Sequence, residues 1–112
     1  SDLLKSRDLA GQGKIKEYYS DLSNIVRRYL EDRFNYRAPE MTTEEFLNHL
    51  KLSSDVEAKH KDLLKDFLTH CDMVKFAKYG PTPIEMIDSF KLAEKLVDET
   101  KIEGAQESGV GK

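Results

Sequence analysis

The chain has 112 residues, which is about one domain and enough to bury a hydrophobic core without disulfides or metal. Charged residues make up 35% and hydrophobic residues 38%, and 18 Lys and Arg stand against 21 Asp and Glu, for a formal net charge of −3. This composition excludes collagen-like, low-complexity and disulfide-stapled chains. It also argues against a general nucleic-acid binder, which is usually basic.

Helical periodicity dominates the first third of the chain. Apolar residues recur at steps of one, three and four between Lys14 and Phe34, which predicts one long amphipathic helix. A short helix over residues 2–9 precedes it, and Gly11–Gly13 forms the turn between the two.

Two capping boxes predict the starts of later helices. Thr42 stands three residues before Glu45, and Thr82 stands three residues before Glu85. In this pattern the threonine and the glutamate each pair with the backbone amide of the other. Pro83, directly after the second threonine, suits the first position of a helix.

Another long helix is expected between these two starts. Ser53 or Ser54 would cap it, and its apolar stripe continues through Val74. Residues 72–79 change the phase of the stripe, which predicts a bend or a tightened turn, and Gly80-Pro81 ends the element.

The predicted fold class is all-α, a compact bundle of four main helices with a short N-terminal helix ahead of them. Residues 1–13 form the lead-in and residues 14–103 the bundle. Residues 104–112 hold three glycines and few apolar groups, so we expect a disordered tail.

The chain carries no pattern typical of an active site or a metal centre. His49, His60 and His70 contain no pair spaced i,i+4, and no Cys-x-x-Cys is present. Cys71 lies in an apolar helical row, where a buried small hydrophobe is expected. We therefore expect no enzyme, no metal and no cofactor.

Basic and aromatic residues supply the candidate binding surface, because tyrosine and arginine are favoured at interface anchors. Adjacent helical residues face different directions, so we expect at most one of Tyr18 and Tyr19 to lie fully inside. The candidates form two groups: Tyr18, Arg27, Arg28 and Arg33, or the Met73–Tyr79 segment with Met73, Lys75, Phe76 and Tyr79.

Three strings in this order resemble one family. They are Glu17–Phe34, Ala38–Leu47, and Cys71–Tyr79 followed by Pro83 and a helix. Together they resemble the cytoplasmic C-terminal domain of bacterial inner-membrane proteins linked to the Bat aerotolerance group, and an uncharacterised membrane-protein family of similar layout. The resemblance covers about residues 14–101.

The resemblance implies a parent protein with a membrane helix upstream of Ser1 and this domain on the cytoplasmic side of the bacterial inner membrane. It also implies a setting beside MoxR-type AAA ATPases and von Willebrand factor A domain proteins, and it carries over no catalytic residue. The chain begins with Ser1 rather than Met, which agrees with a piece of a longer protein.

We therefore expect a non-enzymatic protein–protein interaction module that docks such a partner, with no nucleic acid bound. Two alternatives stay open. One is a DNA-binding helical domain that uses Arg27, Arg28 and Arg37. The other is a structural spacer or a homo-oligomerisation element, and the sequence leaves the oligomeric state undecided.

Overall fold

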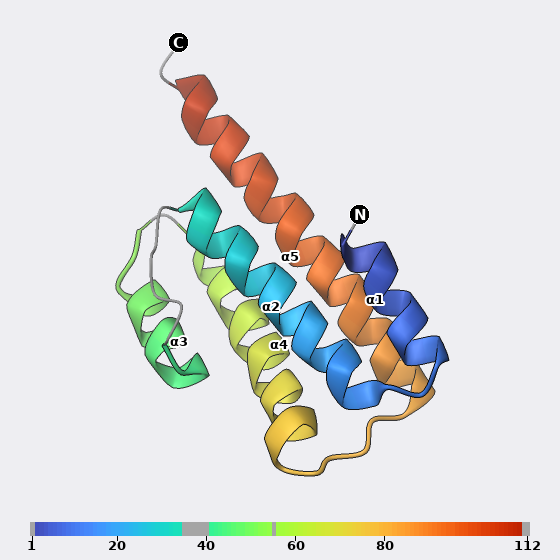
Figure 1. Ribbon diagram of the computed structural model, residues 1–112. Coiled ribbons are helices and arrows are strands. Elements are labelled where there is room, and N and C mark those ends of the chain that lie inside the picture. The colour runs from blue at the N-terminus through green and yellow to red at the C-terminus, as the bar shows by residue number, and fades with distance from the viewer. Residues whose placement is uncertain (1, 35–40, 55, 111–112) are drawn as a thin grey trace.

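The computed structural model describes residues 2–34, 41–54 and 56–110. These residues form five α-helices and no strand, so the predicted all-α bundle is confirmed (Figure 1). The helices are α1 (Asp2–Gly11), α2 (Ile15–Arg33), α3 (Thr43–Lys51), α4 (Ala58–Phe76) and α5 (Pro83–Val110).

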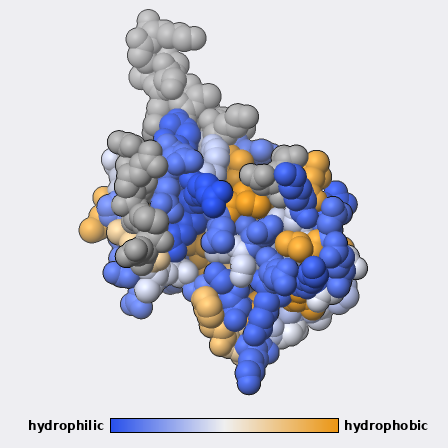
Figure 2. Space-filling view, in the orientation of Figure 1, coloured by the Kyte–Doolittle hydropathy of each residue, from blue (hydrophilic) through white to orange (hydrophobic). Residues whose placement is uncertain are grey.

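The helix α2 lies at the centre of the bundle. It packs against α1, α4 and α5, and α3 lies on the outside against α4 (Figure 1). The core joins the apolar stripes of α2, α3, α4 and α5, and includes Leu22, Phe46, Phe67 and Leu96. Hydrophilic side chains cover most of the face in Figure 2, with apolar patches between them.

Capping boxes begin α3 and α5, as predicted. The Glu45 amide donates to Thr42 Oγ1 at 3.1 Å, and the Thr42 amide donates to Glu45 Oε1 at 3.0 Å. Thr82 and Glu85 exchange the same two bonds at the same distances. The bonds from the threonine amides hold the pKa of both glutamates below the usual range, so each carboxylate stays ionised to lower pH.

The start of α4 differs from the prediction. Its N-cap is Glu57 rather than Ser53 or Ser54, and the cap makes no side-chain hydrogen bond. The reason is tertiary: Val56 is buried in the core, so the connection from α3 must carry this side chain inward before the helix begins.

The end of α4 contains the tightened turn predicted for residues 72–79. The helix stops at Phe76, and Lys78 takes a left-handed conformation with φ of 57°. This turn brings the Tyr79 amide back to the Met73 carbonyl oxygen, to which it donates at 3.1 Å. The helix therefore ends four residues before Gly80, and a lysine supplies the positive φ that glycine more often provides.

Both neighbouring tyrosines of α2 are buried, with 2% of Tyr18 and 0% of Tyr19 exposed, so the prediction that at most one lies fully inside is wrong. The central position of α2 explains this, since other helices cover it on several sides. The Tyr18 hydroxyl donates to the Met86 carbonyl oxygen of α5 at 2.9 Å. The Tyr19 hydroxyl lies 3.0 Å from Ser89 Oγ of α5 and 3.3 Å from His70 Nε2 of α4. Tyr18 thus contributes to the core and not to the outer surface.

The last part of α5 also differs from the prediction. Residues 104–110 have a helical backbone where the composition predicts a disordered tail. Ala105, Gln106 and Glu107 favour this continuation, whereas Gly104 and Gly109 oppose it. Residues 111–112 lie outside the described part of the chain. None of the helices in that part has the length and apolar character needed to cross a membrane.

Candidate functional site

Arg27, a candidate binding residue, is engaged within the fold. Its guanidinium lies over the Phe46 ring, 4.8 Å from the ring centroid, and donates to the Met41 carbonyl oxygen. Its Nε also lies 3.5 Å from a Glu31 carboxylate oxygen on the next turn. These contacts join α2 to α3 and to the residues just before α3. The Arg27 guanidinium therefore already has partners within the fold.

The arginines of α2 do not form one patch. Arg28 is exposed, whereas Arg33 is half-buried with its guanidinium 5.4 Å from the centroid of the Phe34 ring. Each residue turns a helix by about 100°, so Arg27, Arg28 and Arg33 point in three different directions. Arg37, which the DNA-binding alternative also needs, lies outside the described residues.

Three of the candidates at the end of α4 have exposed side chains. Met73 is 43%, Phe76 75% and Tyr79 38% exposed. The Lys75 ammonium lies 4.9 Å from the centroid of the Phe76 ring. The predicted Met73–Tyr79 segment is therefore an exposed apolar surface with a cation beside it.

A cluster of aromatic side chains lies behind this surface, between α2 and α4. The His70 ring meets the rings of Tyr19 and Tyr79 edge-on, with centroids 5.3 and 5.6 Å apart. The Tyr79 hydroxyl donates to both carboxylate oxygens of Glu85, at 2.9 and 2.8 Å, and this bond raises the pKa of Tyr79. Next to His70, burial raises the pKa of the Cys71 thiol to about 12, so it is protonated at neutral pH and is a poor nucleophile.

The buried histidine of α4 joins this helix to α5. His60 Nε2 donates to Glu99 Oε1 at 2.9 Å, and the bond lowers the pKa of the Glu99 carboxyl. The pair is a structural contact at the α4–α5 seam. Across the described ranges, no three His, Cys, Asp or Glu residues are grouped closely enough to hold a metal ion.

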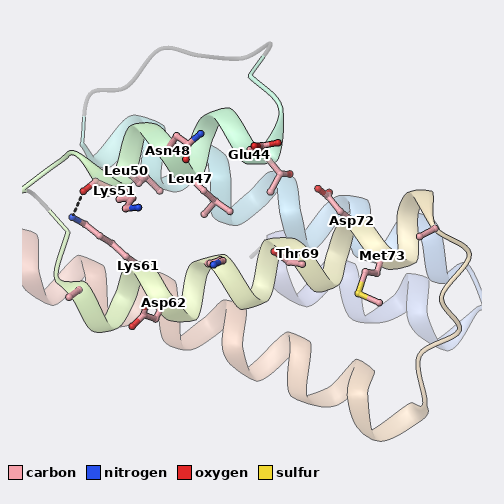
Figure 3. A pocket seen from close by; sticks show the side chains of 14 residues that line it. Glu44, Leu47, Asn48, Leu50, Lys51, Lys61, Asp62, Thr69, Asp72 and Met73 are labelled. Carbon is pink, nitrogen blue, oxygen red and sulfur yellow. Dashed lines mark hydrogen bonds between the residues drawn. The ribbon is translucent and has the colours of Figure 1, made fainter.

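Sequence reasoning missed a groove of about 770 Å³ between α3 and α4, called here the α3–α4 groove. Leu47 and Leu50 line it from α3, and Thr69 and Met73 line it from α4 (Figure 3). Met73 thus belongs both to the predicted Met73–Tyr79 surface and to this groove. Charged side chains flank the apolar floor, so the groove combines an apolar surface with polar edges, as interfaces do.

A signal for the groove does exist in the sequence of α4. The helix carries a second stripe besides its core-facing one, and all of its members except Met73 are small or polar. Small side chains at helical spacing leave space beside a helix, which is how a groove arises next to α3. The stripe consists of Ala58, Asp62, Lys65, Thr69, Met73 and Ala77.

No protein-family model, curated protein or solved structure matches this chain. The described residues form an all-α bundle with an open groove between two antiparallel helices, α3 and α4. The resemblance to the Bat-type domain stays a prediction.

Proposed function

We propose that this chain is a non-enzymatic protein–protein interaction module whose α3–α4 groove binds a helix of a protein partner. The proposal rests on the α3–α4 groove. It has a volume of about 770 Å³ and an apolar floor that no described helix covers. Helix binding in such a groove is a recurring mode of recognition, in which apolar side chains at helical spacing enter the channel.

The groove residues favour binding over chemistry. Leu47 and Met73 give apolar contact area, whereas Leu50 is buried beneath them, and the groove contains no histidine or cysteine among its lining residues. The nearby thiol of Cys71 is fully buried in the core, on another face of α4. Apolar area with charged edges is what a partner helix needs, whereas a reaction would need an activated nucleophile or base.

The resemblance supplies the setting and the partner within this proposal. The parent protein is anchored in the bacterial inner membrane through a helix upstream of Ser1, with this domain on the cytoplasmic side. The partner is a MoxR-type AAA ATPase or a von Willebrand factor A domain protein, which the domain holds near the membrane.

A titration with both purified candidate partners tests the proposal. Thr69→Arg fills the groove from an exposed position of α4, and Asn24→Arg adds the same charge at an exposed position of α2 outside the groove. We expect one of the two partners to bind the native chain and Asn24→Arg alike, and to bind Thr69→Arg at least ten-fold more weakly. Equal binding of the two variants, or no binding of either partner, would contradict the proposal.

A further inference from the structure

The α3–α4 groove is charged oppositely at its two ends. Where α3 ends and α4 begins, three lysines and one aspartate line it. Where α3 begins and α4 approaches its end, two carboxylates line it (Figure 3). The first end holds Lys51, Lys61, Lys65 and Asp62, and the second end holds Glu44 and Asp72.

These charged side chains differ in whether they already make hydrogen bonds or ion pairs within the fold. The Lys61 ammonium donates to the carbonyl oxygens of Lys51 and Ser53 at 3.2 and 2.5 Å, so it caps the end of α3. The side-chain charges of Lys51, Lys65, Glu44 and Asp72 make no ion pair with any described residue. Asp62 makes no ion pair with a described residue either, so the three lysines and this aspartate give the first end a net charge of +2, against −2 at the second end.

The shape of the groove fits a helix. Lining residues on α4 run from Ala58 to Met73, about 23 Å along this helix, and α3 flanks about 13 Å of that length. Its walls, α3 and α4, are antiparallel (Figure 3). Small side chains such as Thr69 leave room for the larger side chains of a third helix, which would pack on Leu47 and Met73.

We propose that the occupant is an amphipathic helix whose two ends carry opposite charges. Its acidic end lies beside Lys51 and Lys65, and its basic end lies beside Glu44 and Asp72. This inference rests on the proposed function, and it adds the chemistry by which the module selects its partner. Charges at the edge of an interface fix register and exclude wrong partners more than they add affinity.

Two fluorescent peptides of about 14 residues serve as probes. Both carry leucines three and four residues apart. The first has two Glu in its first turn and two Lys in its last turn, and its isomer has one Glu and one Lys at each end. Composition and net charge are the same, but Glu at the start and Lys at the end also stabilise the free helix. The part of the preference that Lys65→Gln/Asp72→Asn removes therefore reports the charges of the groove.

Fluorescence anisotropy of each peptide with the full chain gives the result. We expect the charge-separated peptide to bind about ten-fold more tightly than its isomer. The preference falls to about two-fold in roughly 0.5 M NaCl, because salt screens exposed charges. Lys65→Gln/Asp72→Asn reduces the preference to about three-fold, whereas the control Lys5→Gln/Asp8→Asn, on exposed positions of α1, retains it.

Equal affinity for the two isomers overturns the inference on charge and leaves helix binding in place. Failure of both peptides to bind also overturns it, while the partner titration with Thr69→Arg judges the proposed function separately. Sedimentation of the chain alone adds one more outcome. Self-association that Thr69→Arg abolishes would assign the groove to a second copy and overturn the inference.

Discussion

Replacement of Arg27 by alanine is expected to destabilise the bundle by about 2–3 kcal/mol. The cation–π contact with Phe46, partly shielded from water, accounts for about 1 kcal/mol. The hydrogen bond to the Met41 carbonyl oxygen, with a charged donor, contributes about 1–1.5 kcal/mol. The pair with Glu31 adds only a few tenths of a kcal/mol, because such pairs on helices are weak.

Arg28→Ala is the matched control, since this side chain is the next residue in sequence and is exposed. Urea unfolding followed by circular dichroism measures the free energy of unfolding of both variants. We expect a loss of less than about 0.5 kcal/mol for Arg28→Ala. Equal losses of unfolding free energy for the two variants would refute the reasoning, because Arg27 would then contribute no more to stability than its exposed neighbour.

Three further predictions concern buried and capping groups. At pH 8 the Cys71 thiol should react with a disulfide reagent about a thousand-fold more slowly in the folded chain than in urea, because burial raises its pKa to about 12 from 9.0. Stopped-flow absorbance measures both rates, and equal rates would contradict the burial of this thiol. Tyr29→Phe should leave stability unchanged or raise it by up to about 1 kcal/mol, since this buried hydroxyl has no hydrogen-bond partner within the described structure, whereas Tyr19→Phe should cost about 1–2 kcal/mol. Urea titration compares the two, and a larger loss for Tyr29→Phe would contradict the assignment. The pKa values of Glu45 and Glu85 are lowered in the folded state, so their contribution to stability is complete above the ordinary value of 4.5 and is lost as pH falls through the lowered values. Thermal melts between about pH 7 and pH 2.5 should therefore show a shallower acid loss in Glu45→Gln/Glu85→Gln, and a loss as steep as that of the native chain would refute this.

Local features of this fold could be predicted from the sequence. The two capping boxes depend on residues three apart, so Thr42 with Glu45 and Thr82 with Glu85 are readable without any tertiary information. The apolar stripe of α2 is local in the same sense, since its period is set by the helix itself. The fold class follows from such stripes alone.

Features that depend on how helices meet could not be predicted in this way. Tyr18 and Tyr19 are both buried because α2 is covered on several sides, and no spacing within α2 reveals that number of neighbours. Arg27 and Arg28 look equivalent in sequence, and only the position of α3 distinguishes the engaged side chain from the exposed one. The α3–α4 groove has the same origin, since the second stripe of α4 becomes the wall of a groove only because α3 packs beside it.

The proposed function requires that the α3–α4 groove binds a helix. Two-dimensional ¹H–¹⁵N NMR of the labelled chain with the charge-separated peptide tests it most directly. We expect shifts at Leu47, Thr69 and Met73, and a nitroxide on the acidic end of the peptide should broaden the amide of Lys65 more than that of Asp72. Shifts confined to the exposed start of α5, around Ile84, or no shifts at saturating peptide, would contradict helix binding in the groove.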